Sequence, residues 1–405
     1  MVSLYGSATL RAKKEYRQKN EQRTAGRKPR PPPSRSAPLA PATPTFSPAE
    51  IIEDNEQEGE LMITEKSITE LVEGDIGQFF QLRPESLPEA FPEHNRSPAT
   101  AMLPKTGCKG LQEEYAATGQ QYVMYRPYFH ALQKAFEQRQ VKQLLLEGMP
   151  GAGKSIAVAT LAHWARQAGW VVLYVANAEM LTDGGFFSYN EAAGGWDTPQ
   201  SAQYILHNLL ASHKDALAAM RTKDGARSLA EVASEGVDAT SHAVAVDAAL
   251  AVLEGLETQS EVPVLIAVDR YNALFIESEY GQTISDKARR RIPAAELRLA
   301  KAMRLLERKP MANGIHLAAP ARHDRISQRV PVTLLEGCPV AELPRFMPDE
   351  WRNILDWYDA TDVLHQDSMD AMQSFMLCQG NARELRQVGE GLTMQYSTVQ
   401  YHDRR

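Results

Sequence analysis

Four short apolar runs, each bounded by polar or turn-forming residues, predict buried β-strands. Around them, apolar residues recur at the three- to four-residue spacing of amphipathic helices. The predicted strands are Gln143–Glu147, Trp170–Ala176, Pro263–Asp269 and Gly314–Ala319, and the predicted helices are Tyr128–Arg139, Ser155–Gln167, Thr198–Met220, His242–Leu256 and Ala294–Glu307. Continuously apolar strands that alternate with helices predict an α/β fold in which helices cover both faces of a parallel sheet.

The pattern changes on both sides of this region. After Pro348 no further strand is expected, and three helices are predicted over Asp349–Ala360, Ser368–Cys378 and Ala382–Thr393. Towards the N-terminus, only Ser67–Val72 has the pattern of a short helix. The chain is therefore expected to comprise a basic, proline-rich extension (1–60), an irregular arm (61–120), an α/β domain (121–347) and a small C-terminal helical domain (348–405).

Charge is distributed unevenly along the 405 residues. Residues 1–40 contain ten basic and two acidic residues, a net charge of +8, which leaves −15 for the rest of a chain whose total is −7. The prolines between Pro29 and Pro48 predict an extended spacer behind this tail. A basic tail on an acidic body predicts either salt-dependent RNA binding or a transit peptide that is removed on import.

The remaining composition is that of an ordinary soluble protein, with 43% hydrophobic and 23% charged residues. No window approaches the 18 consecutive apolar residues of a transmembrane helix, so no membrane partner is expected. Cys108, Cys338 and Cys378 are widely spaced and odd in number. They indicate neither a disulfide framework nor a zinc site, and they fit a reducing compartment.

A phosphate-binding loop follows the first predicted strand and precedes a predicted helix. The segment Gly148–Ser155 matches G-x-x-x-x-G-K-[ST] at every fixed position. Glycines allow a tight turn whose N–H groups converge on a phosphate, and the helix that follows begins with unpaired N–H groups. The residues expected to bind the nucleotide here are Gly148, Met149, Pro150, Gly151, Ala152, Gly153, Lys154, Ser155 and Ile156.

Two residues are candidate magnesium ligands. The Ser155 hydroxyl can enter the magnesium shell, and Asp269 ends a buried strand that is expected to lie next to the loop, where it can hold a metal-bound water. A helix cap or a salt bridge is the alternative role of Asp269. The next residue is Arg270, where nucleotide hydrolases of this type usually carry a carboxylate that orients the attacking water. The sequence therefore predicts nucleotide binding with little or no hydrolysis.

Two further positions have alternative roles. Arg383 lies in the first turn of the last predicted helix and could reach the phosphates, whereas Asn381 could cap that helix. The fourth strand lacks an asparagine or threonine at its end to sense the γ-phosphate, and for His316, which could serve, a core role is favoured. There is no N-K-x-D segment of the kind that recognises guanine, so the residues alone do not determine which base the nucleotide carries.

Taken together, these residues resemble the GTP-binding mitochondrial small-subunit ribosomal protein family known as death-associated protein 3, a P-loop family similar to AAA/STAND proteins. The resemblance covers roughly Met124 to Thr393. Its most specific segments are Arg126–His130 followed by LLLEGMPGAGKS, the strand Trp170–Ala176, Trp196-Asp197-x-Pro199 before a long helix, and IAVDRYNALF at Ile266–Phe275. The C-terminal GNARELR is also similar, whereas Met149-Pro150 and Ser155 depart from the family's frequent lysine-containing loop and threonine.

The resemblance implies a structural component of the mitochondrial ribosome's small subunit, located in the mitochondrial matrix and supporting translation. The implied partners are ribosomal RNA, neighbouring small-subunit proteins and the large subunit at the interface. The implied ligands are GTP or GDP with Mg²⁺, with ATP as an alternative. Two competing hypotheses are an active AAA/STAND-type ATPase or GTPase switch and, less well supported, a nucleotide kinase whose only candidate phosphate cluster is Arg289-Arg290-Arg291. That run is more typical of a solvated surface or an RNA contact.

Overall fold

The computed structural model describes residues 63–93, 97–285, 288–321, 332–364 and 370–388. The predicted basic extension lies outside these residues, as do the first two residues of the predicted helix Ser368–Cys378 and the end of Ala382–Thr393. Within the described part, no helix is long and apolar enough to cross a membrane.

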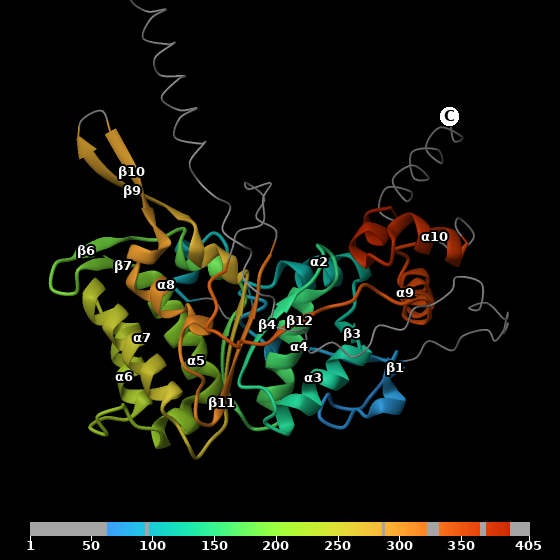
Figure 1. Ribbon diagram of the computed structural model, residues 1–405, viewed down its shortest axis with the longest axis horizontal. Coiled ribbons are helices and arrows are strands. Elements are labelled where there is room, and N and C mark those ends of the chain that lie inside the picture. Colours follow the sequence, from blue (N-terminus) through green and yellow to red (C-terminus); the bar gives the residue numbers. More distant parts are fainter. Residues whose placement is uncertain (1–62, 94–96, 286–287, 322–331, 365–369, 389–405) are drawn as a thin grey trace, which may run out of the picture. The chain divides into compact units, whose positions relative to one another are not determined.

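A five-stranded parallel sheet forms the centre of the fold (Figure 1). Its strand order is β12-β4-β11-β8-β5, and every neighbouring pair is parallel. The strands are β12 (Val340–Glu342), β4 (Gln143–Glu147), β11 (Gly314–Ala319), β8 (Val264–Asp269) and β5 (Val171–Val175). The four predicted strands are confirmed, and β12 is an additional edge strand paired with β4.

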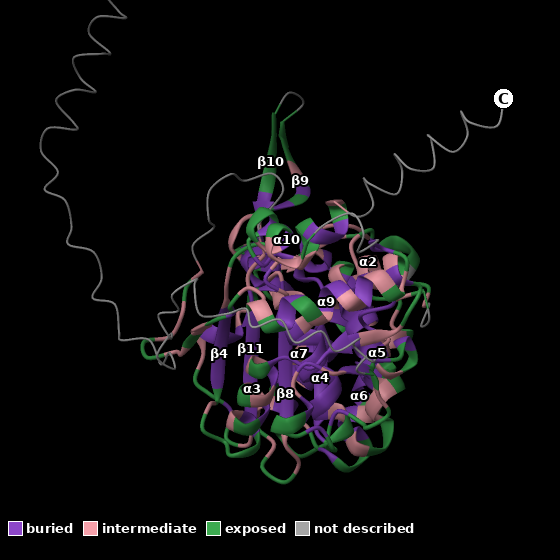
Figure 2. Ribbon diagram, turned by 90° about the vertical axis from the view of Figure 1, so that its right-hand side faces the viewer, coloured by how far each residue is buried: buried purple, intermediate pink, exposed green. Residues whose placement is uncertain are grey.

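Alternate residues of these strands face two separate cores, as the pleat of a β-strand requires. Leu144, Val172 and Leu265 pack with one set of helices, whereas Leu173 and Ile266 pack with another. The first set contains α3 (Pro127–Glu137) and α4 (Lys154–Gln167), and the second contains α5 (Pro199–Ala219), α6 (Leu229–Asp238) and α7 (His242–Glu257). The predicted α/β fold with both faces covered is confirmed (Figures 1 and 2).

The segment before the central sheet has its own regular structure. Strands β1 (Ile63–Thr64), β2 (Phe79–Gln81) and β3 (Tyr122–Met124) form a small sheet, and helix α2 is Lys109–Thr118. The helix predicted over Ser67–Val72 is wrong, because these residues form turns followed by a single 3-10 turn at Glu73–Asp75. Side chains bind the backbone here, since the Ser67 N–H donates to the Glu70 carboxylate and the Val72 N–H to that of Asp75. Such bonds compete with helix formation.

The predicted helix Ala294–Glu307 is also wrong. The chain forms three short pieces, η6 (Ala294–Glu296), α8 (Arg298–Ala302) and η7 (Leu305–Glu307). Leu297 is extended (φ −82°, ψ 118°) and forms a parallel β-bridge with Trp196. This tertiary pairing outweighs the local helical periodicity, which on its own is a weak determinant.

Two β-hairpins that the periodicity does not predict lie on the side of the sheet covered by α5 to α8 (Figure 1). One consists of β6 (Ser188–Asn190) and β7 (Gly195–Asp197), and the other of β9 (Glu277–Ser285) and β10 (Ala288–Pro293). The C-terminal helices form a third core around Trp351. Their described parts confirm the prediction, with α9 at Pro348–Ala360, α10 at Ala371–Cys378 and helical residues 382–388.

We expect a histidine between α5 and the sheet to make stability depend on pH. Helix α5 kinks at His213, whose Nε2 accepts a hydrogen bond from the Val172 N–H (3.1 Å). Burial and the nearby charge of Arg166 lower the pKa of His213 to about 4. An unfolded histidine titrates near 6.5, so below that pH the unfolded chain gains a proton that the folded chain lacks. Stability should therefore fall as pH decreases from 6.5 towards 4, by about 2 kcal/mol from this residue at pH 5.

The variant His213→Gln retains an acceptor for the Val172 N–H but cannot titrate. Urea unfolding at pH 7 and pH 5 should show a smaller loss of stability in this variant than in the unmodified chain. The same loss in both proteins would contradict the assignment. His163, whose pKa is also lowered to about 4, is present in both proteins and cancels from the comparison.

Candidate nucleotide-binding site

The loop between β4 and α4 depends on three glycines in left-handed backbone conformations. Gly148, Gly151 and Gly153 have φ values of 147°, 81° and 92°, and α4 begins at Lys154. A side chain at Gly151 would clash, since its Cβ would lie 2.0 Å from Asn381 Oδ1. Glycine is thus required both by the turn and by the close approach of the C-terminal helices. The N-terminus of α4 presents the unpaired N–H groups expected of an anion site.

Two side chains of the loop carry the chemistry that the motif predicts. Lys154 Nζ donates to the carbonyl oxygens of Gly148 (2.7 Å) and Met149 (3.0 Å), so its charge lies over the loop. The Ser155 hydroxyl lies close enough to the Asp269 carboxylate to lower its pKa. Asp269 is buried at the end of β8, and this burial raises its pKa against the opposing effects of Ser155 and Arg270. A carboxylate in this setting gains from a nearby cation.

The carboxylate nearest to Arg270 is neutralised by two cations. Arg270 Nη1 lies 2.8 Å from Glu179 Oε1, and Lys105 Nζ lies 3.2 Å from Glu179 Oε2. Burial raises the pKa of Glu179, but Arg270 and Lys105 outweigh it and hold the pKa below its usual range. Arg270 itself has a left-handed backbone (φ 54°), which is uncommon for a residue with a side chain. Glu179 is therefore a poor proton acceptor.

The segment that follows β8 holds the end of the neighbouring strand, β11, in place. Asn272 donates to the carbonyl of Ala321 (2.7 Å) and accepts from the Ala321 N–H (2.8 Å). These two bonds hold the chain just after β11, where Pro320 and Ala321 line the cavity described below. The asparagine of the quoted IAVDRYNALF segment thus shapes one wall of the site.

A buried arginine connects the loop to the C-terminal helices. Arg126 precedes α3 and bonds both oxygens of Glu350 (2.7 and 3.1 Å). Its guanidinium also donates to the carbonyl oxygens of Ala152 in the loop (3.2 Å) and of Pro344 and Arg345. It stacks on the rings of Tyr128 and Phe346, at 4.6 and 4.0 Å from their centroids. Asn381 adds a second connection through its bond to the Pro150 carbonyl (3.3 Å).

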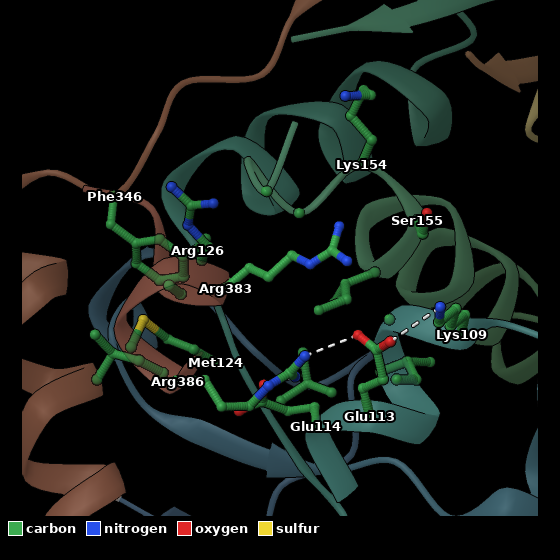
Figure 3. Close-up of a pocket in the computed structure, with 18 of the residues that line it drawn as sticks. Lys109, Glu113, Glu114, Met124, Arg126, Lys154, Ser155, Phe346, Arg383 and Arg386 are labelled. Carbon is green, nitrogen blue, oxygen red and sulfur yellow. Dashed lines mark hydrogen bonds and ion pairs between the residues drawn. The ribbon is translucent and has the colours of Figure 1, made fainter. Parts of the chain in front are cut away.

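These elements enclose a cavity of about 730 Å³, a size suited to a nucleotide. Figure 3 shows Arg383 extending from the C-terminal segment into the cavity, towards the helix that carries Ser155. The same lining includes the aromatic residues Phe79, Tyr122 and Trp357, and the rings of Phe79 and Trp357 stack at 4.6 Å. The cavity therefore combines the cationic side chains of Lys154 and Arg383 with an aromatic surface.

Two carboxylates on α2, those of Glu113 and Glu114, also line the cavity. Arg386 lies 2.8 Å from Glu113 and 3.0 Å from Glu114, and Lys109 lies 3.5 Å from Glu113 (Figure 3). The Tyr358 hydroxyl donates to Glu114 (3.1 Å). These contacts fix carboxylate oxygens beside an aromatic surface.

The predicted site residues are largely brought together. Pro150, Gly151, Gly153, Lys154, Ser155, Ile156 and Arg383 line the cavity. Asp269 lies behind Ser155, while the Met149 side chain is exposed and Ala152 is buried. The amide nitrogen of Asn381 donates to Pro150 and Glu384, so its side chain connects to the loop and does not form the predicted cap.

Other predicted candidates lie elsewhere. His316 is fully buried in the middle of β11, 3.4 Å from the Gln143 amide, as expected of a core residue. Arg289, Arg290 and Arg291 lie on β10 and are not among the residues that line the cavity, so the kinase hypothesis loses its candidate phosphate cluster. The sequence reasoning missed the roles of Arg126 and Glu350, and no local spacing relates residues so far apart in the chain.

Comparisons with known proteins agree with this architecture. The family described as mitochondrial ribosomal death-associated protein 3 matches residues 126–336, which is more than half of the chain. This match contains the phosphate loop, β8 and the β9–β10 hairpin. A search of curated proteins finds no match. The chain thus belongs to the mitochondrial ribosomal death-associated protein 3 family and is a mitochondrial ribosomal protein of the mitochondrial matrix.

Proposed function

We propose that this chain is a structural component of the small subunit that binds a guanine nucleotide and Mg²⁺ in the cavity between the phosphate loop and the C-terminal helices. The observation that carries the proposal is that Lys154, Ser155 and Arg383 all line one nucleotide-sized cavity, into which Arg383 extends. Polyphosphate requires N–H donors and mobile cations in this arrangement. The closed structure that results would support docking to ribosomal RNA and neighbouring proteins.

The residues present fit magnesium held largely by phosphate and water. No cluster of three or more potential metal-binding side chains occurs within the described residues. The donor set is one hydroxyl and one carboxylate, from Ser155 and Asp269, which lie close enough for Ser155 to lower the pKa of Asp269. Mg²⁺ usually retains several waters and takes one or two protein ligands besides substrate phosphates. When bound, the metal supplies charge neutralisation for the phosphates.

The aromatic side chains of the cavity support a purine base, and the carboxylates of Glu113 and Glu114 favour guanine. Phe79 and Trp357 offer apolar ring surfaces. Carboxylate oxygens accept hydrogen bonds. Guanine presents adjacent N–H donors on its pairing edge, whereas adenine presents both a donor and an acceptor there. The base can be identified by releasing the nucleotide from natively purified protein and separating it by chromatography. GTP or GDP is expected, and ATP or ADP would overturn the guanine assignment.

Small-subunit membership is tested by sedimentation of the native protein. Co-migration with the mitochondrial small subunit is expected. Migration as a free protein, together with rapid nucleotide turnover, would favour an AAA/STAND-type switch instead.

Purified protein is expected to hydrolyse GTP slowly or not at all. Arg270 occupies the position of the usual water-orienting carboxylate, and the nearest alternative, Glu179, is held by Arg270 and Lys105. A single-turnover assay with radiolabelled GTP measures the rate. A turnover on the order of 1 per second, within the usual enzyme range, would rule out a purely structural nucleotide.

A further inference from the structure

The β9–β10 hairpin is a basic projection that the nucleotide site does not use. Figure 1 shows that it extends away from the layers of helices and sheet, and Figure 2 shows the same projection from a second direction. Ile284, in its outer half, is 63% exposed. All described residues from Thr283 to Arg291 are exposed. The outer half of the hairpin therefore offers both its faces to a partner.

The base of the hairpin is firmly anchored. The Ser278 hydroxyl donates to the Ile292 carbonyl (2.5 Å), and the Tyr280 hydroxyl donates to the Gly184 carbonyl (2.5 Å). The Tyr280 ring also packs on Phe187, with 4.8 Å between centroids. These bonds join the two strands to each other and to the β6–β7 region. Because the base is fixed, the outer half is already held in place before a partner binds, and binding loses less entropy.

The outer half carries three consecutive arginines. Because side chains alternate along a strand, Arg290 lies on one face, and Arg289 and Arg291 lie on the other. The residues opposite Arg289 and Arg291 in the register are the small Thr283 and Gly281, which leave the guanidinium groups uncovered. Small cross-strand partners therefore keep the arginines of that face accessible.

The arginines form only weak ion pairs within the chain. Arg290 is 2.8 Å from Glu296, and Arg291 is 3.4 Å from Glu279, and all four side chains are at least partly exposed. Exposed pairs of this kind contribute about 0–1 kcal/mol, so an external anion can replace them. Arg289 has no acidic partner among the residues that the structure describes.

The net charge of the outer half of the hairpin indicates which class of molecule it binds. The sequence from Gly281 to Arg291 contains four basic residues and one acidic residue, a net charge of +3, within a body that is otherwise acidic. Within the described part of this tip, Ile284 is the one large apolar side chain that is exposed, so the tip lacks the apolar surface found at the centre of protein interfaces. Guanidinium groups bind phosphate oxygens in a bidentate manner. These features favour a nucleic-acid backbone over an apolar protein surface.

We propose that the β9–β10 hairpin binds the phosphate backbone of ribosomal RNA through Arg289, Arg290 and Arg291. The arginines position the protein on RNA and do not read its bases, since most such contacts carry no sequence information. The proposal rests on membership of the mitochondrial ribosomal family and is independent of nucleotide binding. The hairpin thus has a role separate from the nucleotide cavity.

The first test replaces all three arginines with alanine in the full-length protein. Affinity for purified small-subunit ribosomal RNA, measured over a salt titration, should fall, and the slope of log affinity against log salt should decrease by about 3, one unit for each lost phosphate contact. The triple lysine variant should keep most of the slope. The matched control, Lys223→Ala with Arg227→Ala, removes two equally exposed charges from another surface and should leave RNA binding unchanged.

Nucleotide retention and the melting temperature should be unchanged in all variants, which separates failure of the hairpin from failure of the nucleotide site. The second test places a photo-crosslinking amino acid at Thr283 in assembled small subunits. A crosslink to RNA supports the proposal. A crosslink only to protein, or an alanine variant with the RNA affinity and salt slope of the unmodified chain, overturns it.

Discussion

Lys154→Ala is expected to abolish nucleotide retention. The ammonium group lies over the loop through its bonds to the Gly148 and Met149 carbonyls. Alanine removes this charge from the β- and γ-phosphates while the glycine turn remains. Protein purified natively, desalted and denatured should release about one nucleotide per chain before the substitution and none after it.

The same variant should lose the stabilisation that nucleotide provides. A ligand at 100 times its dissociation constant adds about 2.7 kcal/mol to the folded state. Added GTP with Mg²⁺ should raise the melting temperature of the unmodified protein and leave that of the variant unchanged. Lys223→Ala is the matched control, because it removes an exposed lysine that does not line the cavity. Equal nucleotide retention in Lys154→Ala would refute the site.

Arg126→Met should be among the most destabilising single substitutions in the chain. The change leaves the Glu350 carboxylate buried without its cation and removes donors from the carbonyls of Ala152, Pro344 and Arg345. Removing one partner of a buried ion pair typically costs about 3–5 kcal/mol. Urea unfolding should show a loss of this size. Nucleotide affinity should fall as well, because the bond to the phosphate loop is lost.

A double-mutant cycle measures the interaction energy between Arg126 and Glu350 separately from their contacts with other residues. Glu350→Leu combined with Arg126→Met removes both charges, so the double variant should be less destabilised than the sum of the two single variants. Arg298→Met is a useful comparison, since Arg298 pairs with buried Asp197 far from the loop. Its stability should fall while its nucleotide affinity is kept. A loss below about 1 kcal/mol in Arg126→Met would contradict the coupling between the loop and the C-terminal helices.

Periodicity predicted the central sheet well because its strands are continuously apolar and buried on both faces. It failed where tertiary contacts decide the conformation. Leu297 is extended because it pairs with Trp196, and Ser67–Val72 is not helical because Asp75 and Glu70 bind the backbone. β12 is too short and too exposed to have a detectable pattern. Its place in the sheet depends on β4, a contact that no local window contains.

The loop that lines the cavity could be predicted because its residues are consecutive. Gly148 to Ser155 carry the turn, the cation and the hydroxyl within one loop. The rest of the lining could not be predicted, since Phe79, Glu113 and Trp357 come from separate elements and have no motif in common. The sequence identified Arg289–Arg291 by their charge alone. Only the structure shows that these arginines lie on a projecting hairpin with an anchored base.

The Arg126–Glu350 pair also determines when, during synthesis of the chain, the pocket can close. The two residues are 224 positions apart, and Asn381 is 231 positions from Pro150. A chain made from its N-terminus completes the glycine turn long before these partners exist, and domains generally fold in that order. The finished pocket is therefore the last part of the protein to form. Any truncation before residue 381 should leave a sheet without a closed pocket, so retained nucleotide would report that synthesis has reached the C-terminal helices.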